Sequence, residues 1–195
     1  MSSADLLAHS PPRRWASTLL RLAGWRVELT PPPEPRCLLI VYPHTSNWDF
    51  LVGILAKWSC GWPAHWLAKH TLFRGPFGPL LRYWGGIPVN RNAPGGFVED
   101  LAARIKARES AILVIAPEGT RRYQEYWKSG FMRIALAAQL PVGLIAFDYR
   151  KRCVKLLEYV DLTGDVKADM AHVARLYEGV EGRIPSQAGP IRLRG

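Results

Sequence analysis

Residues 37–58 read CLLIVYPHTSNWDFLVGILAKW, and this stretch decides the class of fold. Its first six residues, Cys37 to Tyr42, are apolar without interruption, as in a strand that is buried on both faces. From Asn47 to Trp58 the apolar side chains recur at helical spacing, which predicts a helix. A buried strand followed by a short polar loop and a helix is the repeating unit of α/β proteins.

The same alternation of strands and helices continues toward the C-terminus. It predicts one α/β domain with a largely parallel sheet covered by helices. The length of 195 residues fits one such domain. Further strands are expected at 65–68, 86–89, 111–116, 142–147 and 153–159, and further helices at 97–108, 130–139 and 168–177.

The two ends of the chain differ from this pattern. Ser10-Pro11-Pro12 is typical of a helix start, and the residues after it predict an amphipathic helix. Its basic and tryptophan side chains suit the interface of a membrane, although a surface helix packed on the core explains the pattern equally. Its apolar face is formed by Trp15, Leu19, Leu22 and Ala23. The expected division is 1–35 for this helix and a Pro-rich connector, 36–178 for the domain, and 179–195 for an irregular tail.

Charge and composition restrict the partners. Lys and Arg number 26 against 16 Asp and Glu, a net charge of +10 that favours an anionic partner such as nucleic acid, anionic lipid or a phosphorylated substrate. No apolar run reaches the roughly 18 residues that a membrane span needs, and the N-terminus lacks the pattern of a signal peptide. The three cysteines are scattered, so no metal site is expected.

Polar residues follow three of the expected strands. They are HTSNWD at 44–49, VNR at 89–91 and PEGTRR at 117–122. Ligands bind in open α/β sheets where strands end and loops enter helices. We therefore expect these three loops to converge at one edge of the sheet.

His44 and Asp49 are the candidate catalytic pair. If Ser46 or Asn47 caps the new helix, Asp49 lies in its first turn and its carboxylate can reach back to one imidazole nitrogen. The other nitrogen is then free to act as a base. A structural histidine beside a helix-start acid is the alternative. The sequence holds no GxSxG elbow, which excludes the common type of serine hydrolase.

The motifs together resemble the glycerolipid acyltransferases. Residues 44–49 match the HxxxxD box of that family, and 86–91, 117–121 and 140–145 are similar to its second, third and fourth blocks. The resemblance extends from about 39 to 147. It implies that His44 and Asp49 are catalytic. The residues that it implies in acceptor binding are Arg91, Glu118, Gly119, Thr120 and Arg121, with Lys128 from the basic stretch that follows as a further substrate contact.

The resemblance also implies a reaction. A fatty acyl group passes from acyl-CoA or acyl carrier protein to the hydroxyl of a lysophospholipid, with histidine as general base, no covalent intermediate and no bound cofactor. Such an enzyme is expected to lie peripherally on the cytoplasmic face of the membrane, against an anionic surface, without nucleic acid. Two alternatives stay open: another lysolipid acceptor such as a lyso-aminolipid, and a non-enzymatic basic module that binds lipid or nucleic acid.

Three positions depart from the family pattern. Ala116 stands where an aromatic or bulky residue is common, Arg122 where serine is common, and Leu144 where a second proline is usual. Leu144 falls in a buried strand, so we expect it to affect packing or the acyl channel. Arg122 adds a cation that can alter the preference for the acceptor's head group.

Overall fold

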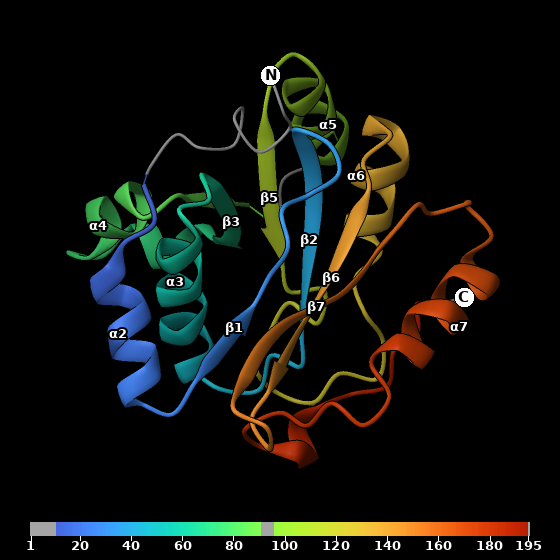
Figure 1. The fold of residues 1–195 in the computed structure, drawn as a ribbon. Coiled ribbons are helices and arrows are strands. Elements are labelled where there is room, and N and C mark those ends of the chain that lie inside the picture. Colours follow the sequence, from blue (N-terminus) through green and yellow to red (C-terminus); the bar gives the residue numbers. More distant parts are fainter. Residues whose placement is uncertain (1–10, 91–95, 195) are drawn as a thin grey trace.

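A seven-stranded sheet forms the centre of the protein in the computed structural model, which describes residues 11–90 and 96–194. The strand order is β1-β7-β6-β2-β5-β3-β4 (Figure 1). The strands are β1 (Arg26–Glu28), β2 (Arg36–Tyr42), β3 (Ala64–Lys69), β4 (Gly86–Val89), β5 (Ala111–Ile115), β6 (Val142–Asp148) and β7 (Cys153–Val160).

Five of the six strand pairings are parallel, and only β6 and β7 run antiparallel. Strand β2 lies between β6 and β5, so its hydrogen-bonding edges are both occupied. A parallel pair needs a crossover connection, which explains why helices separate most of the strands. The structure confirms the expected single α/β fold with a mostly parallel sheet.

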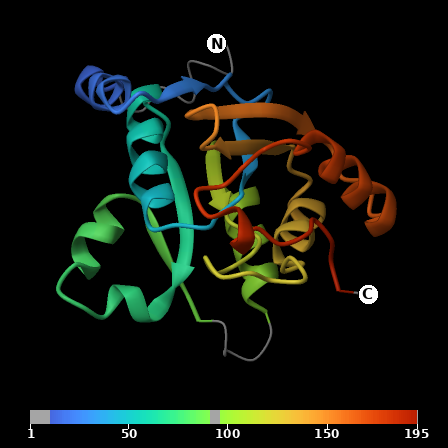
Figure 2. The same cartoon turned by 90° about the horizontal axis from the view of Figure 1, so that it is seen from below.

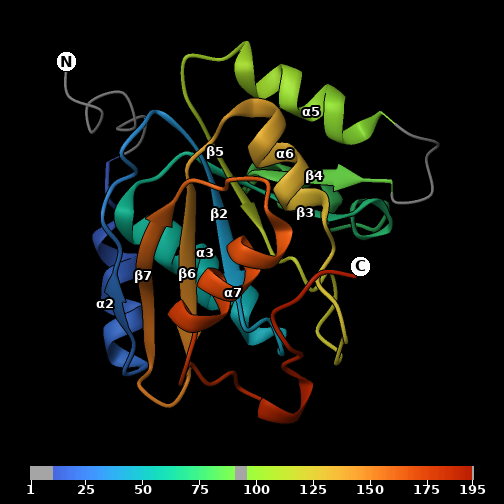
Figure 3. The ribbon, with the colours of Figure 1, turned by 90° about the vertical axis from the view of Figure 1, so that its right-hand side faces the viewer.

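Helices cover both faces of the sheet. In Figure 1, α2, α3 and α4 lie on the left of the sheet and α5, α6 and α7 on its right, the side that faces the viewer in Figure 3. The α-helices are α2 (Arg14–Leu22), α3 (Trp48–Cys60), α4 (Gly78–Tyr83), α5 (Phe97–Lys106), α6 (Gly130–Ala138) and α7 (Val166–Leu176), and the 3₁₀ helices are η1 (His70–Phe73) and η2 (Pro185–Gln187).

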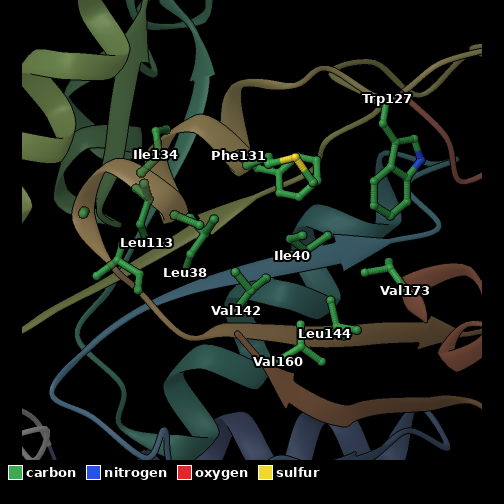
Figure 4. Packing of buried hydrophobic residues seen from close by; sticks show 14 of the residues in the cluster. Leu38, Ile40, Leu113, Trp127, Phe131, Ile134, Val142, Leu144, Val160 and Val173 are labelled. Atoms are coloured by element: carbon green, nitrogen blue, oxygen red, sulfur yellow. The ribbon is translucent and has the colours of Figure 1, made fainter. Parts of the chain in front are cut away.

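Side chains of β2 supply both hydrophobic cores. Leu38 and Ile40 point into the cluster under α5, α6 and α7 (Figure 4). Cys37 and Leu39 point the other way, into the cluster that includes residues of α2 and α3. Burying a leucine or isoleucine fully contributes roughly 1.5–3 kcal/mol. The uninterrupted apolar run of β2 follows from these two cores, because neither face of the strand meets water.

The start of the first helix differs from the expectation. Pro11 and Pro12 precede the helix, which begins at Arg14 after Arg13 as its N-cap residue; Ser10 lies outside the described residues. The backbone N–H of Arg13 donates to the carbonyl of Trp58 at 2.8 Å, in an extended conformation. This tertiary bond to the end of α3 sets the helix start, and the local proline pattern does not.

The segments at 26–28 and 184–189, outside the central strands and helices, both bond to the rest of the domain. Strand β1, which lies between the expected N-terminal helix and the Pro-rich connector, pairs with β7. The described C-terminal stretch, which contains η2, crosses the end of the sheet. The Ile184 N–H donates to Thr45 Oγ1 at 3.2 Å, and the Tyr42 hydroxyl donates to the Gly189 carbonyl at 2.9 Å. The elements that the pattern did not indicate, β1, α4 and η1, have three to six residues each, too few to show a period.

Candidate active site

The loops after β2 and β5 lie side by side. Their strands are neighbours and run parallel, so both loops leave the same edge of the sheet, which Figure 2 views from below. The third expected loop, after β4, is described only as far as Asn90, and Arg91 lies outside the described residues. Strand β3 separates β4 from β5.

The Asp49 carboxylate organises the loop of residues 44–49. Its Oδ2 atom accepts hydrogen bonds from the backbone N–H groups of Thr45 and Ser46, both at 2.8 Å. Asp49 lies in the first turn of α3, where the helix dipole favours a negative charge. The loop therefore curls around the carboxylate, with Asn47 as the N-cap residue of α3.

This curl brings His44 to Asp49. Nδ1 of His44 lies 3.1 Å from Oδ2 of Asp49, with the two side chains 17% and 0% exposed. The separation is that of a hydrogen bond, although Nδ1 has no well-aligned partner among the described residues. A carboxylate at Nδ1 holds the tautomer and leaves Nε2 as the nitrogen free for proton transfer.

Tyr149 completes the surroundings of Asp49, and no local pattern in the sequence marks it. It lies in the turn between β6 and β7, and its hydroxyl donates to Oδ1 of Asp49 at 2.6 Å. Its ring packs edge-on against Trp25 at 4.8 Å, and its backbone N–H donates to the carbonyl of Glu181 at 2.8 Å. Trp25 thus holds the ring of Tyr149, and Glu181 holds its main chain.

These contacts decide the charge of Asp49. Burial by itself would raise the pKa of Asp49, but the contact with His44 and the hydrogen bonds from Tyr149 and the Ser46 backbone outweigh it and lower that pKa. Burial, followed by the bond to Asp49, raises the pKa of the Tyr149 hydroxyl. At neutral pH the tyrosine is therefore the donor and Asp49 the charged acceptor.

Glu118 is buried beside the pair and supports the main chain of His44. Its side chain is among the fully buried ones, the residue being 1% exposed, and its Oε2 accepts the His44 backbone N–H at 2.7 Å. Burial raises the pKa of Glu118 to about 8; the bond from His44 opposes this rise and the charge of Asp49 adds to it. The contact that Glu118 makes in the structure is thus with the main chain of His44, and its expected role in acceptor binding stays a prediction.

The other expected residues of the 117–128 stretch are spread more widely. Gly119 has a φ of +68°, a conformation that glycine adopts without strain, and Thr120 Oγ1 accepts the Arg122 N–H at 3.4 Å. Arg121 is half-buried, and its Nε has no hydrogen-bond partner within the described part of the chain. The backbone N–H of Lys128 donates to the Pro117 carbonyl at 2.8 Å, and its side chain is exposed.

An apolar cavity of about 140 Å³ begins at the pair and runs along α3. His44 and Asp49 line it, and so does Gly53, where a β-carbon would lie 3.2 Å from the ring of Phe147. The other side chains around it are mainly aliphatic and aromatic, and they include Leu39, Phe50, Ile54, Trp62, Val114 and Ile145.

A second, larger cavity of about 510 Å³ lies on the other side of β5. Its lining includes Asn90, Gly119 and Lys128, together with the first residues of α5 and α6. Ala116 and Leu67 line both cavities. Ala116 and Leu67 therefore stand between the two cavities.

Comparison with known proteins assigns the chain to a family. The family model described as Acyltransferase matches residues 28–147, more than half of the chain. The chain belongs to the acyltransferase family. This membership supports an acyltransferase enzyme and removes the alternative of a non-enzymatic binding module. No curated protein matches the sequence.

A solved structure shows the same fold. The acyltransferase chain is similar to the crystal structure of the 1-acyl-sn-glycerophosphate (LPA) acyltransferase PlsC from Thermotoga maritima, with a TM-score of 0.55 and 18% sequence identity. The similarity covers 86% of this chain and 74% of that chain. At this identity the likeness concerns the fold alone.

The three residues that depart from the family pattern lie in different parts of the structure. Leu144 is fully buried in the core under α5, α6 and α7, so it affects packing and does not line the apolar cavity. Arg122 is exposed, and Ala116 lies at the junction of the two cavities. Among the described residues, no group of three or more His, Cys, Asp and Glu side chains is placed to hold a metal ion.

The raised pKa of Glu118 predicts a pH-dependent stability. The unfolded chain releases this proton near pH 4.5 and the folded one near pH 8, so the contribution of Glu118 is full below pH 4.5 and is lost as pH rises toward 8. Each rise of one pH unit in this interval lowers the free energy of unfolding by at most about 1.4 kcal/mol. In Glu118→Gln, which keeps an oxygen for the His44 N–H, urea unfolding should show a stability gain over wild type that grows through this interval and then levels off. A constant difference at every pH would contradict the assignment.

Proposed function

We propose that the protein transfers a fatty acyl group from a thioester, acyl-CoA or acyl carrier protein, to the hydroxyl of a lysophosphatidate-like acceptor. One observation carries this proposal: the His44–Asp49 pair lines a mainly apolar cavity, and of the described residues only Ala116 and Leu67 are shared between its lining and that of a second cavity, which Lys128 lines. We infer that the acyl chain occupies the first cavity, beside His44, and that the phosphate of the acceptor binds in the second. The product would enter phospholipid biosynthesis.

His44 acts as the general base in the proposed reaction. Histidine readily takes up and releases a proton near neutral pH. Nε2 of His44 accepts the proton of the acceptor hydroxyl while its oxygen attacks the thioester carbon. The carbon–sulfur bond then breaks, and the proton on His44 passes to the leaving thiolate. Asp49 stabilises the transient imidazolium, so no covalent acyl-enzyme and no bound cofactor are needed.

The apolar cavity is the proposed place of the acyl chain. Its walls are mainly hydrocarbon between His44 and Asp49 at one end and Lys57 at the other, and burying a CH₂ group contributes about 0.8 kcal/mol. Gly53 leaves a gap in the middle of the α3 wall, opposite Phe147. An acyl chain along α3 would place its thioester end beside His44.

The larger cavity is the proposed place of the acceptor's head group. Lys128 and the N-terminus of α6 both favour an anion there. Arg91, Thr120 and Arg121 keep their expected roles in acceptor binding as proposals that rest on the resemblance. Another lysolipid, such as a lyso-aminolipid, is the second candidate acceptor.

We further propose that α2 rests on the cytoplasmic face of an anionic membrane. None of the helices within the described ranges is long and apolar enough to cross a bilayer. Ala16 and Leu20 pack into the core, whereas Trp15, Leu19 and Leu22 on the opposite side are exposed, Leu22 by 80%. A helix that buries one apolar stripe and exposes a second one suits a monotopic attachment.

Removal of the proposed base should abolish acyl transfer. His44→Ala is expected to lower kcat for lysophosphatidate by at least 100-fold, the lower end of the usual contribution of a general base. Release of free thiol from acyl-CoA, followed with a panel of lysolipids, measures it. His172→Ala, which removes an exposed histidine of α7, is the matched control and should keep full activity. Near-wild-type kcat in His44→Ala would refute the mechanism.

Loss of the Tyr149 hydroxyl should shift the pH profile. Tyr149→Phe removes a donor from Asp49, so Asp49 stays protonated to a higher pH and no longer orients His44 there. The acid limb of kcat/KM should move up by about one pH unit, since a hydrogen bond to a charged group contributes roughly 1.5–3 kcal/mol. Tyr159→Phe, whose hydroxyl donates to Thr30, is the control. If Tyr149→Phe lowers activity but leaves the acid limb of kcat/KM at the same pH, Tyr149 has only a packing role.

The Lys128 side chain should recognise the phosphate of the acceptor. Lys128→Met is expected to raise KM for lysophosphatidate roughly 10- to 100-fold, the size of a lost charge-assisted contact, and to leave KM for an uncharged monoacylglycerol unchanged. Lys167→Met, on the exposed side of α7, serves as the control. An equal loss with both acceptors would remove the argument for phosphate recognition.

A further inference from the structure

A third cavity lies at the end of α3 that is far from the catalytic pair. Its volume is about 230 Å³. Lys57, which lines it, follows Asp49 by eight residues, so the helix places them about 12 Å apart along its axis. The residues that matter for its chemistry are Arg13, Lys57, Trp58, Trp62, Tyr83 and Trp84.

Two cations face this cavity without a counter-ion. The guanidinium of Arg13 lies 5.2 Å from the centre of the Trp58 ring, and Nζ of Lys57 donates to the Trp84 carbonyl at 2.8 Å. No acidic residue is among the cavity's lining, and neither cation has an ion pair within the described ranges. Burial, and then the charge of Arg13, lowers the pKa of Lys57 to about 8. An anion between the two cations would relieve this repulsion.

The walls of the cavity are amphipathic. Tryptophan and tyrosine rings combine an apolar body with a polar tip, and they are common where proteins meet the interface of a bilayer. The cavity is joined to the exposed face of α2, because the ring of Trp15 packs against that of Trp58 with centroids 5.3 Å apart. Tyr83, in α4, is 78% exposed at the same place. Trp15, Trp58 and Tyr83 belong to α2, α3 and α4, and these three helices lie together on the left of the molecule in Figure 1.

We propose that this cavity binds the phosphate group of an anionic phospholipid at a bilayer surface. Arg13 and Lys57 contact the phosphate oxygens, the aromatic rings surround the glycerol, and the exposed face of α2 meets the acyl region beside it. Lys57 and Trp62 also line the apolar cavity, but Arg13 and Tyr83 line only this third one, and neither His44 nor Asp49 borders it, so the bound lipid is not proposed as a reactant. The inference rests on the proposed membrane attachment of α2 and is independent of acyl transfer.

Binding to vesicles tests the two cations. Phosphatidylcholine vesicles with and without phosphatidylglycerol are pelleted with wild type, Arg13→Gln, Lys57→Met and the control Arg21→Gln, which removes an exposed cation of α2 outside the cavity. Each cavity variant should bind the anionic vesicles at least tenfold more weakly, as expected for a lost charge-assisted hydrogen bond. Arg21→Gln should lose about fivefold or less, as for general surface attraction. Arg13 is exposed, so its variant tests the proposal even if Lys57→Met does not fold.

Binding of a soluble lipid tests whether the anionic lipid occupies the cavity beside Lys57. Dihexanoyl phosphatidylglycerol below its micelle concentration should raise the pKa of Lys57, followed by NMR of its side-chain nitrogen, because an anion at Nζ favours the charged form. Lys128→Met should leave this rise intact, since Lys128 lines the other polar cavity. Leu19→Ser should weaken vesicle binding but not the response to the soluble lipid.

Two results would overturn the proposal. Cavity variants that bind anionic vesicles no worse than Arg21→Gln, with a Lys57 pKa unmoved by the lipid, would leave only general electrostatic attraction. An equal response of Lys57 to inorganic phosphate at the same concentration would assign the cavity to a free phosphate. Loss of activity in His44→Ala does not bear on either result, so failure of this inference is separable from failure of the proposed reaction.

Discussion

A single buried carboxylate, that of Asp49, constrains the arrangement of the whole site. A charge without exposure to water is tolerated only when hydrogen bonds and opposite charge surround it. Asp49 obtains them from two separate parts of the chain: the loop after β2 and the turn after β6. The turn is held in place by Trp25 and by the C-terminal stretch at Glu181. Trp25, the centre of the sheet and Glu181 are thus connected through the surroundings of one side chain.

Asp49 and Glu118 show how two buried carboxyl groups take opposite states. Asp49 has several donors, so its pKa falls and it is ionised. Glu118 accepts a hydrogen bond from the His44 backbone, which is too little to offset its burial, and its pKa rises to about 8. At neutral pH one group carries a charge and the other a proton. This difference lets both lie beside His44 without the repulsion of two adjacent anions.

The sequence predicts what depends on neighbouring residues and fails where distant segments meet. The buried run of β2 and the spacing of α3 are local signals, and the sheet and its covering helices follow from them. Tyr149 lies 100 residues from Asp49, and nothing around it in the sequence marks a partner. The motif around Glu118 predicts a contact with a ligand but does not reveal that the residue is buried. Its burial depends on how the loop after β5 folds over His44. The start of α2 depends on the Trp58 carbonyl, a tertiary contact that the prolines do not reveal.

Helix α3 carries Asp49, Gly53 and Lys57 at intervals of four residues, so all three lie on one stripe and line the same cavity. This spacing makes the helix intolerant of a change in length. One inserted residue after Gly53 would rotate Lys57 by about 100° out of the stripe and advance it by 1.5 Å. Loops elsewhere in the molecule can lengthen at little cost in free energy. Over evolutionary time, insertions are therefore expected to accumulate in the connections around α3 and to be excluded from the helix itself.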